Sequence, residues 1–211
     1  MNDDTTQTNC VFCQRSKIDT YILKETPHFR IITDYAPLVE GHLLIMPQEH
    51  YACYGTVPAS FDAELHELKR EVRTFFDRFY ASPVVFWEHG VFRQTVFHAH
   101  LHCFPFKGIT YNLTDGLHDL VVSSQDDLRT WYASQGHYFY LEDPHHALLF
   151  SPDMDRYFHV IRTILWTGAT AHNGKTEWRS PQQRQEAGKA MIPLTAARWK
   201  QFQQQGEAHA Q

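Results

Sequence analysis

The sequence has no run of basic residues, and its 19 lysines and arginines are outnumbered by 24 aspartates and glutamates. A nucleic-acid interface that depends on a broad basic face is therefore disfavoured, although a local phosphate site is not. No apolar run approaches the roughly 20 residues of a membrane span, and the polar, acidic start MNDDTTQTN does not resemble a signal peptide. Four cysteines in 211 residues do not make a disulfide framework, which favours a cytoplasmic, reducing location.

The spacing of apolar residues predicts an α+β fold, a mostly antiparallel sheet with a long helix packed on it. Ser60 is expected to open that helix, whose apolar residues recur at three- and four-residue steps as far as Phe79. Further helices are expected at 123–134 with Ser123 as N-cap and Asp126 at N3, at 154–167, and in a short segment capped by Thr195 and ending near 205. Strands are expected at 18–26, 28–34, 43–47, 83–89, 94–104 and near 107–113, with a hairpin over 137–150.

Three histidines stand at every second position in QTVFHAHLHCFP, residues 94–105. Side chains alternate between the two faces of a strand, so His98, His100 and His102 are expected on one face. Imidazoles titrate near neutral pH, so three of them on one face favour a catalytic role. The alternative is that these three histidines are hydrogen-bonded residues of the core. The opposite face is expected to be a core face of Phe97, Ala99, Leu101 and Cys103.

The spacing of Cys10 and Cys13 in CVFC suits two thiolates that share one tetrahedral zinc. Alone, the motif is equally compatible with chance, a redox pair or an incomplete zinc knuckle. No second C-x₂-C is present, so histidines would have to complete a closed site, and His50 and His98 stand in the best contexts. The two remaining cysteines, Cys53 and Cys103, are expected in the core.

Two motifs in combination resemble the histidine-triad (HIT) superfamily of nucleotide hydrolases and transferases. Its signature is His-x-His-x-His followed by two hydrophobic residues and usually preceded by Gln-x-Val, and residues 94–104 fill it. Upstream, the family carries Asp or Asn three residues before a Pro, then Gly-His and a strand, as do Asp34, Pro37, Gly41 and His42. The resemblance covers about residues 10–105 and implies a HIT-like domain at 10–106. Residues 1–9 are expected to form a flexible tail, and residues 107–211, which have strand and helix patterning, an extension packed on that domain.

The resemblance assigns roles to individual residues. His100 corresponds to the family nucleophile, which attacks an α-phosphorus as a neutral imidazole and forms a nucleotidyl intermediate. His102 would stabilise the phosphate in the transition state. The amide of Gln94 would bind the phosphate or the leaving-group oxygen. Asp34 would accept hydrogen bonds from the ribose hydroxyls. For His42 two roles remain possible, one in the core and one as a support beside the site. Zinc-containing bacterial members imply a structural Zn²⁺ held by Cys10, Cys13, His50 and His98.

The segment before the signature departs from the family. The family usually has Asn or Gln, a Gly, then a small residue and Gly, whereas this chain has EHGVFRQ at 88–94, with Phe92 and Arg93 in place of the small pair. Glycine lets the backbone approach a phosphate closely, whereas Arg93 would supply a charge-assisted contact to the substrate instead. Leaving-group recognition is therefore where this chain is expected to differ.

These observations predict a HIT-type nucleotide hydrolase that releases a nucleoside monophosphate, above all AMP. Its substrate would be a dinucleoside polyphosphate, a phosphoramidate or a related nucleotidyl compound. The alternatives are a nucleotidyltransferase to an acceptor other than water, a catalytically silent nucleotide-binding module, and a zinc-stabilised nucleic-acid binder, which the acidic charge disfavours. The intact histidine set argues against a silent module, because binding alone requires no nucleophile. The resemblance also suggests a homodimer through the long helix and sheet edge, unless the extension covers that surface.

Overall fold

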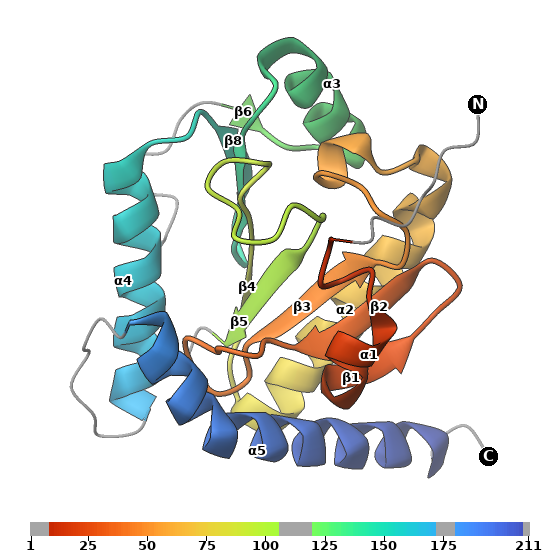
Figure 1. Ribbon diagram of the computed structural model, residues 1–211, viewed down its shortest axis with the longest axis vertical. Helices are drawn as coiled ribbons and strands as arrows, with labels where there is room; N and C mark the ends of the chain where they lie inside the picture. The colour runs from red at the N-terminus through yellow and green to blue at the C-terminus, as the bar shows by residue number, and fades with distance from the viewer. Residues whose placement is uncertain (1–8, 106–119, 172–179, 209–211) are drawn as a thin grey trace.

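An eight-stranded antiparallel sheet organises the chain in the computed structural model, which describes residues 9–105, 120–171 and 180–208 (Figure 1). The strand order is β1-β2-β3-β5-β4-β7-β8-β6. The fold class is α+β, as predicted. The strands are β1 (Ile22–Glu25), β2 (Phe29–Thr33), β3 (Leu43–Pro47), β4 (Val84–Glu88), β5 (Leu101–Pro105), β6 (Leu120–Val121), β7 (Phe139–Glu142) and β8 (Ala147–Phe150).

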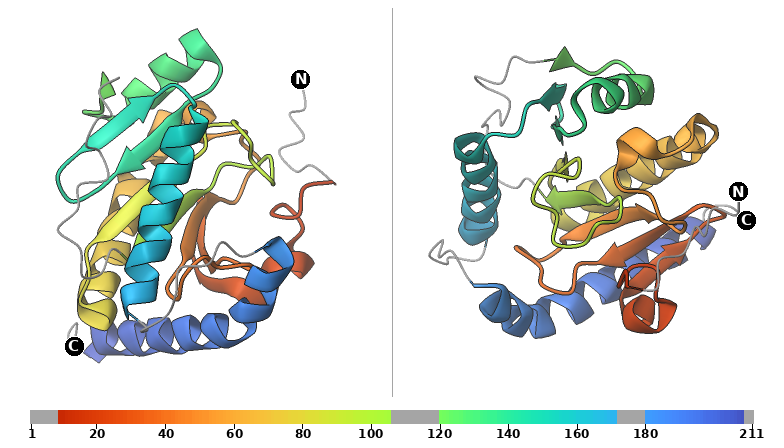
Figure 2. Two further views of the ribbon diagram at one scale, coloured as in Figure 1. Left: turned by 90° about the vertical axis from the view of Figure 1, so that its left-hand side faces the viewer. Right: turned by 45° about the horizontal axis from the view of Figure 1, so that its top comes forward.

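Helices lie on both faces of the sheet and along one end of it (Figure 2). The long helix α2 packs on one face, α4 lies on the other face beside β7 and β8, and α5 runs along one end against α2. Trp199 and Phe202 of α5 contact the ring of Phe75 in α2, with ring centroids 4.8 and 5.6 Å apart. The helices are α1 (Arg15–Ile18), α2 (Asp62–Tyr80), α3 (Gln125–Gln135), α4 (Met154–Ala171) and α5 (Pro181–Ala208), with 3₁₀ turns at Asp19–Tyr21, Tyr54–Thr56 and Ala59–Phe61.

The C-terminal extension continues the sheet of the N-terminal half. Strand β7 pairs with the outer edge of β4, and β8 and β6 follow it. Lys69 of α2 secures this junction, because its ammonium group binds both the Glu142 carboxylate and the Tyr140 hydroxyl of β7. A buried ammonium is retained only when it is paired in this way. The extension therefore shares the core of the domain that precedes it.

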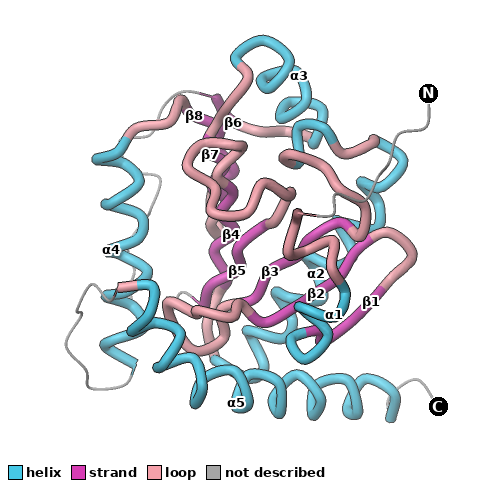
Figure 3. The backbone as a smooth tube through the Cα atoms, viewed as in Figure 1, coloured by secondary structure: helices cyan, strands magenta, loops and turns pink. Residues whose placement is uncertain are grey.

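The predicted strand over 94–104 is wrong in its first half. The ladder of β5 begins only at Leu101, and residues 94–100 lie in the loop that precedes it (Figure 3). A tight turn in which the His98 N–H donates to the Val96 carbonyl (2.9 Å) interrupts the alternation. As a result Phe97, expected in the core, is 63% exposed. The other predicted core positions of this segment and the two remaining cysteines are buried, namely Ala99, Leu101, Cys103 and Cys53.

Three helix starts differ from the prediction. The long helix expected from Ser60 begins at Asp62, after a 3₁₀ turn at Ala59–Phe61. The helix expected at 123–134 begins one residue later, because Ser124 is its N-cap and Asp127 closes a capping box. The short helix expected from Thr195 is wrong: α5 starts at Pro181, where Ser180 and Gln183 exchange capping hydrogen bonds. Thr195 lies buried inside α5, and its hydroxyl accepts the Gly41 N–H (3.0 Å). This helix contains a proline, Pro193, in its interior.

Other predicted elements are confirmed or lie outside the described residues. Strand β3 occupies the expected residues, and the hairpin over 137–150 forms as β7 and β8. The strand expected at 18–26 covers only Ile22–Glu25, since α1 and a 3₁₀ turn precede it. The strand near 107–113 and most of the tail at 1–9 lie outside the described residues. Among the helices of the described chain, none combines the length and the apolarity that a membrane crossing requires.

Glu88 carries a pH-dependent part of the stability of this fold. Its carboxylate is fully buried and accepts from the Tyr54 N–H (2.8 Å) and from the hydroxyl of Tyr138 (2.6 Å), which precedes β7. Burial raises the pKa of Glu88 from 4.5 to about 7. The folded state therefore binds a proton more tightly than the unfolded state does, and stability is lost as the pH rises from about 4.5 through about 7.

We expect Glu88→Gln to remove this part of the pH dependence, which is about 3 kcal/mol across that interval. Urea unfolding at pH 5 and pH 8 measures it: the native protein should lose more stability between the two values than the variant does. Glu49→Gln, at an exposed position, is the control and should lose as much as the native protein. An equal loss in the Glu88 variant would contradict the assignment.

Candidate active site and metal-binding cluster

The pairing of three central strands brings the histidines together on the face that α2 does not cover. His102 of β5 pairs with Leu44 of β3 on one side and with Trp87 of β4 on the other. His42 immediately precedes β3, and its ring lies 5.1 Å from that of His102. The rings of His100 and His102 are 4.8 Å apart. The three predicted histidines therefore share one face, although only His102 belongs to the strand ladder.

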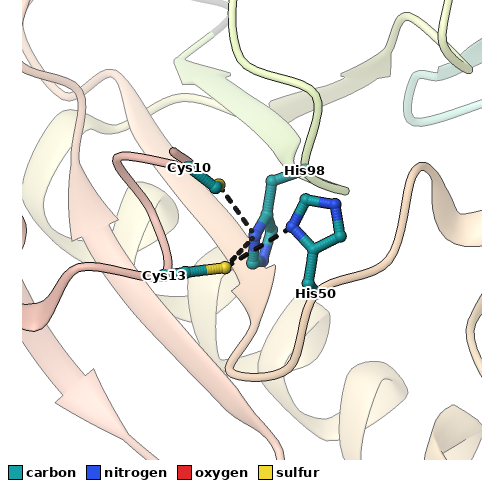
Figure 4. A group of neighbouring side chains, drawn as sticks. All are labelled: Cys10, Cys13, His50 and His98. Carbon is teal, nitrogen blue, oxygen red and sulfur yellow. Dashed lines mark hydrogen bonds between the residues drawn. The ribbon is translucent and has the colours of Figure 1, made fainter. Parts of the chain in front are cut away.

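A second group forms where the N-terminal segment reaches this face. Cys10, Cys13, His50 and His98 place one ligand atom each within 4.8 Å of one another (Figure 4). The Sγ of Cys13 lies 3.4 Å from Nδ1 of His50 and 3.5 Å from Nδ1 of His98. The Sγ of Cys10 is also 3.5 Å from Nδ1 of His98. The sequence therefore identified all four members of this cluster.

The spacing within the cluster fits a tetrahedral zinc ion. Zn–S bonds of about 2.3 Å and Zn–N bonds of about 2.0–2.1 Å at a tetrahedral angle hold sulfur and nitrogen about 3.5 Å apart. The three sulfur–nitrogen distances are 3.4, 3.5 and 3.5 Å. The Nε2 of His98 lies 2.9 Å from the Pro47 carbonyl, to which it donates, so Nδ1 carries the lone pair that a metal requires. The donor set and its geometry are compatible with zinc.

The tautomer of His100 is fixed by the backbone. Its Nδ1 lies 2.6 Å from the carbonyl oxygen of His98. A carbonyl only accepts hydrogen bonds, so Nδ1 carries the proton and Nε2 carries a lone pair. The ring is 6% exposed and lies edge-on against Phe12, with centroids 5.4 Å apart. Burial lowers the pKa of His100 from its ordinary value, which favours the neutral, nucleophilic form.

His42 and His102 form a directional hydrogen-bonded pair. The Leu38 N–H donates to Nδ1 of His42 (3.3 Å), so the proton of His42 is on Nε2. That nitrogen lies 2.9 Å from Nδ1 of His102 and donates to it, which leaves the proton of His102 on Nε2. Burial lowers the pKa of His42 to about 4 and that of His102 well below the usual range. His102 therefore presents an N–H donor, and His42 supports it.

Asp34 lies beside this pair. One carboxylate oxygen accepts the Ala36 N–H (2.7 Å), and the other lies 3.7 Å from Nε2 of His42. The first contact is the turn role that an Asp before Pro37 is expected to have. Helix α5 braces this loop, since the Arg198 guanidinium lies 2.5 Å from the Glu40 carboxylate.

Gln94 is 7% exposed, and neither its amide oxygen nor its amide nitrogen has a hydrogen-bond partner within the described chain. A buried amide without partners is costly, so this side chain is suited to bind a group that is not part of the protein. Two residues just before it, Val91 (φ 67°) and Arg93 (φ 53°), have left-handed backbone conformations. Such strain in non-glycine residues concentrates at functional sites.

Arg93 is exposed, and its guanidinium donates to the sulfur of Met154 in α4 at 3.4 Å. Its positive charge helps to lower the pKa of Tyr157, although burial leaves that pKa raised overall. Arg93 therefore lies at the junction between the loop and α4.

His89 and Tyr157 are two residues of this region to which the sequence assigned no role. The His89 ring lies 5.7 Å from that of His102 and 5.4 Å from that of Tyr157. His89 directly follows β4 and is separated from Trp87 by two positions. Alternation along a strand therefore predicts both side chains on the same face, so the sequence could have identified His89. Tyr157 comes from α4, and no motif marks it.

The comparisons with known proteins bear on the N-terminal half. Residues 15–108 match the family profile described as HIT domain. An uncharacterised HIT-like protein of Mycoplasma genitalium is 26% identical over 121 residues, which are 53% of this chain and 85% of the relative.

Solved structures that match part of this chain include a HIT family hydrolase from Clostridium thermocellum, at 27% identity and a TM-score of 0.41 over 51% of this chain and 96% of that chain. A zinc-bound histidine triad family protein from Mycobacterium smegmatis has 22% identity and a TM-score of 0.40 over 61% and 96%. Residues 15–108 are therefore similar to the HIT domain family, and the remainder of the chain lies outside that match.

Proposed function

We propose that this protein is a nucleotide hydrolase of the HIT type that releases a nucleoside monophosphate such as AMP. Its substrate is a dinucleoside polyphosphate, a phosphoramidate or a related nucleotidyl compound. The observation that carries the proposal is the hydrogen bond from Nδ1 of His100 to the His98 carbonyl, which leaves Nε2 unprotonated. Nε2 attacks the α-phosphorus, the bond to the leaving group breaks, and a nucleotidyl-His100 intermediate forms.

Four residues near His100 support the other parts of this reaction, which are binding the substrate and stabilising the transition state. The Nε2–H of His102 stabilises the charge that develops on the phosphate oxygens. The amide of Gln94, which has no partner within the described chain, binds the phosphate or the leaving-group oxygen. The Asp34 oxygen that is not used in the turn accepts from the ribose hydroxyls, and Arg93 contacts the leaving group at the junction with α4. Water or another acceptor then cleaves the intermediate.

We further propose that Cys10, Cys13, His50 and His98 hold one structural Zn²⁺. The sulfur–nitrogen separations and the lone pair on Nδ1 of His98 support this assignment. When bound, the ion fixes the N-terminal segment to the loop that precedes β5. The chemistry is left to His100, because a closed site with four protein ligands keeps no position open for substrate.

Incubation of the native protein with diadenosine polyphosphates and with an adenosine phosphoramidate tests the proposed activity, with AMP measured by chromatography. Release of AMP with water as the acceptor supports a hydrolase. AMP transfer to an added alcohol or phosphate supports the nucleotidyltransferase alternative. Binding without turnover of any of these compounds would indicate a silent module.

We expect His100→Ala to lower turnover by several orders of magnitude, because it removes the covalent route. AMP binding, measured by calorimetry, should largely survive, since Asp34 and His102 remain. His102→Ala should cost less, about 10²–10³-fold, as for one lost transition-state donor. His66→Ala, at an exposed position of α2, is the control. Near-normal turnover in the His100 variant would refute the assigned roles.

Elemental analysis of protein purified without chelator should find one zinc per chain. Cys10→Ser should lower both the metal content and the stability, since a structural zinc contributes folding free energy directly. Cys53→Ala serves as the matched control: it removes a buried thiol in the core, so stability should fall while the zinc content stays at one. Full zinc occupancy in His98→Ala would contradict the ligand assignment.

The homodimer suggested by the family resemblance would need a different surface in this chain. Strand β7 occupies the outer edge of β4, and α5 packs against α2. We therefore expect light scattering to give a mass near 24.7 kDa, the value for one chain. Twice that mass would show that two copies associate elsewhere.

A further inference from the structure

His89 is a fourth histidine at the candidate site, and it lies outside the family signature. The β4–β5 ladder pairs Trp87 with His102, and His89 follows Trp87 by two residues in the chain. The His89 ring lies 5.7 Å from the ring of His102. It is held from the other side by Tyr157 of α4 and Phe139 of β7, at 5.4 and 5.7 Å. Both of these residues belong to the extension.

The hydrogen bonds of the histidines decide which of their nitrogens can accept a proton. On His42, Nδ1 accepts from Leu38 and Nε2 donates. On His102, Nδ1 accepts from His42 and Nε2 carries the proton. Neither ring has a lone pair available to a substrate.

Two ring nitrogens at the candidate site do keep such a lone pair. One is Nε2 of His100, since Nδ1 of that ring donates to the His98 carbonyl. The other is Nε2 of His89, since Nδ1 of that ring lies 3.0 Å from the Phe92 carbonyl and must donate to it. The site therefore contains one nucleophile and one further base.

We propose that His89 is the general base of the second half-reaction, in which nucleotidyl-His100 is broken. This inference rests on the proposed function, because it requires the covalent intermediate. Nε2 of His89 takes a proton from the attacking water, and the water oxygen bonds to the α-phosphorus. The bond between phosphorus and Nε2 of His100 breaks, and its electron pair returns to that nitrogen. The products are the nucleoside monophosphate and a protonated His89, which loses its proton to solvent.

Two carboxylates of the described residues, Asp34 and Glu88, lie in this region and do not suit this task. Asp34 uses one oxygen in a backbone turn and holds the other beside His42. Glu88 points to the opposite face, where it binds Tyr54 and Tyr138. Burial lowers the pKa of His89 to about 4, so the ring is neutral and unprotonated at neutral pH. An anionic phosphate beside it favours the protonated form and so assists the transfer.

Rapid-quench kinetics with a radiolabelled substrate separates the two half-reactions. In His89→Asn and His89→Ala, formation of nucleotidyl-enzyme should stay within a few-fold of the native rate. Its breakdown should slow by about 10²–10⁴-fold, so the labelled protein accumulates. Added imidazole should restore breakdown in His89→Ala, where it can occupy the vacated space. His66→Ala should behave as the native protein does.

Breakdown at the native rate in both His89 variants would overturn the proposal. So would a loss of both half-reactions together, since that marks His89 as a structural residue. Failure of the proposed function gives a different result: the native protein itself would then form neither labelled intermediate nor nucleoside monophosphate.

Discussion

The hydrogen bond from His100 Nδ1 to the carbonyl of His98 is the interaction on which the site depends. His98 is constrained from three sides, because its Nδ1 faces the cysteine thiols, its Nε2 binds the Pro47 carbonyl and its own carbonyl holds His100. The position of His100, the proposed nucleophile, is thus tied to the proposed zinc cluster. His98 of the proposed metal site and His100 of the proposed reactive site share one short loop, so we expect a disturbance of the first site to misorient the second.

The extension completes the same region from the opposite side. Strand β7 and helix α4 bring Phe139 and Tyr157 against His89, while α5 braces the loop that carries Asp34 and His42. Gly188 of α5 comes so close to Pro37 that a Cβ there would lie 2.8 Å from the proline ring. The HIT domain and the extension therefore build one site together, and the residues that distinguish this chain from the family pattern lie where they meet.

Much of the site could be predicted because its motifs are local. Alternation predicted His98, His100 and His102 on one face, although the strand begins only at Leu101, and C-x₂-C with two histidines predicted the members of the cysteine–histidine cluster. The tautomers could not be predicted, since they depend on backbone carbonyls and on Leu38, which carry no sequence signal. The early start of α5 could not be predicted because its first turns are polar, whereas burial of Trp199 and Phe202 against α2 sustains the helix.

Long-range ¹H–¹⁵N correlation spectra of histidine-labelled protein at neutral pH test the central claim directly, because they distinguish the two neutral tautomers of each ring. The account predicts the Nδ1–H form for His100 and His89 and the Nε2–H form for His42 and His102, assigned from single-histidine variants. A His100 ring protonated on Nε2 would have no lone pair to attack a phosphorus and would contradict the account.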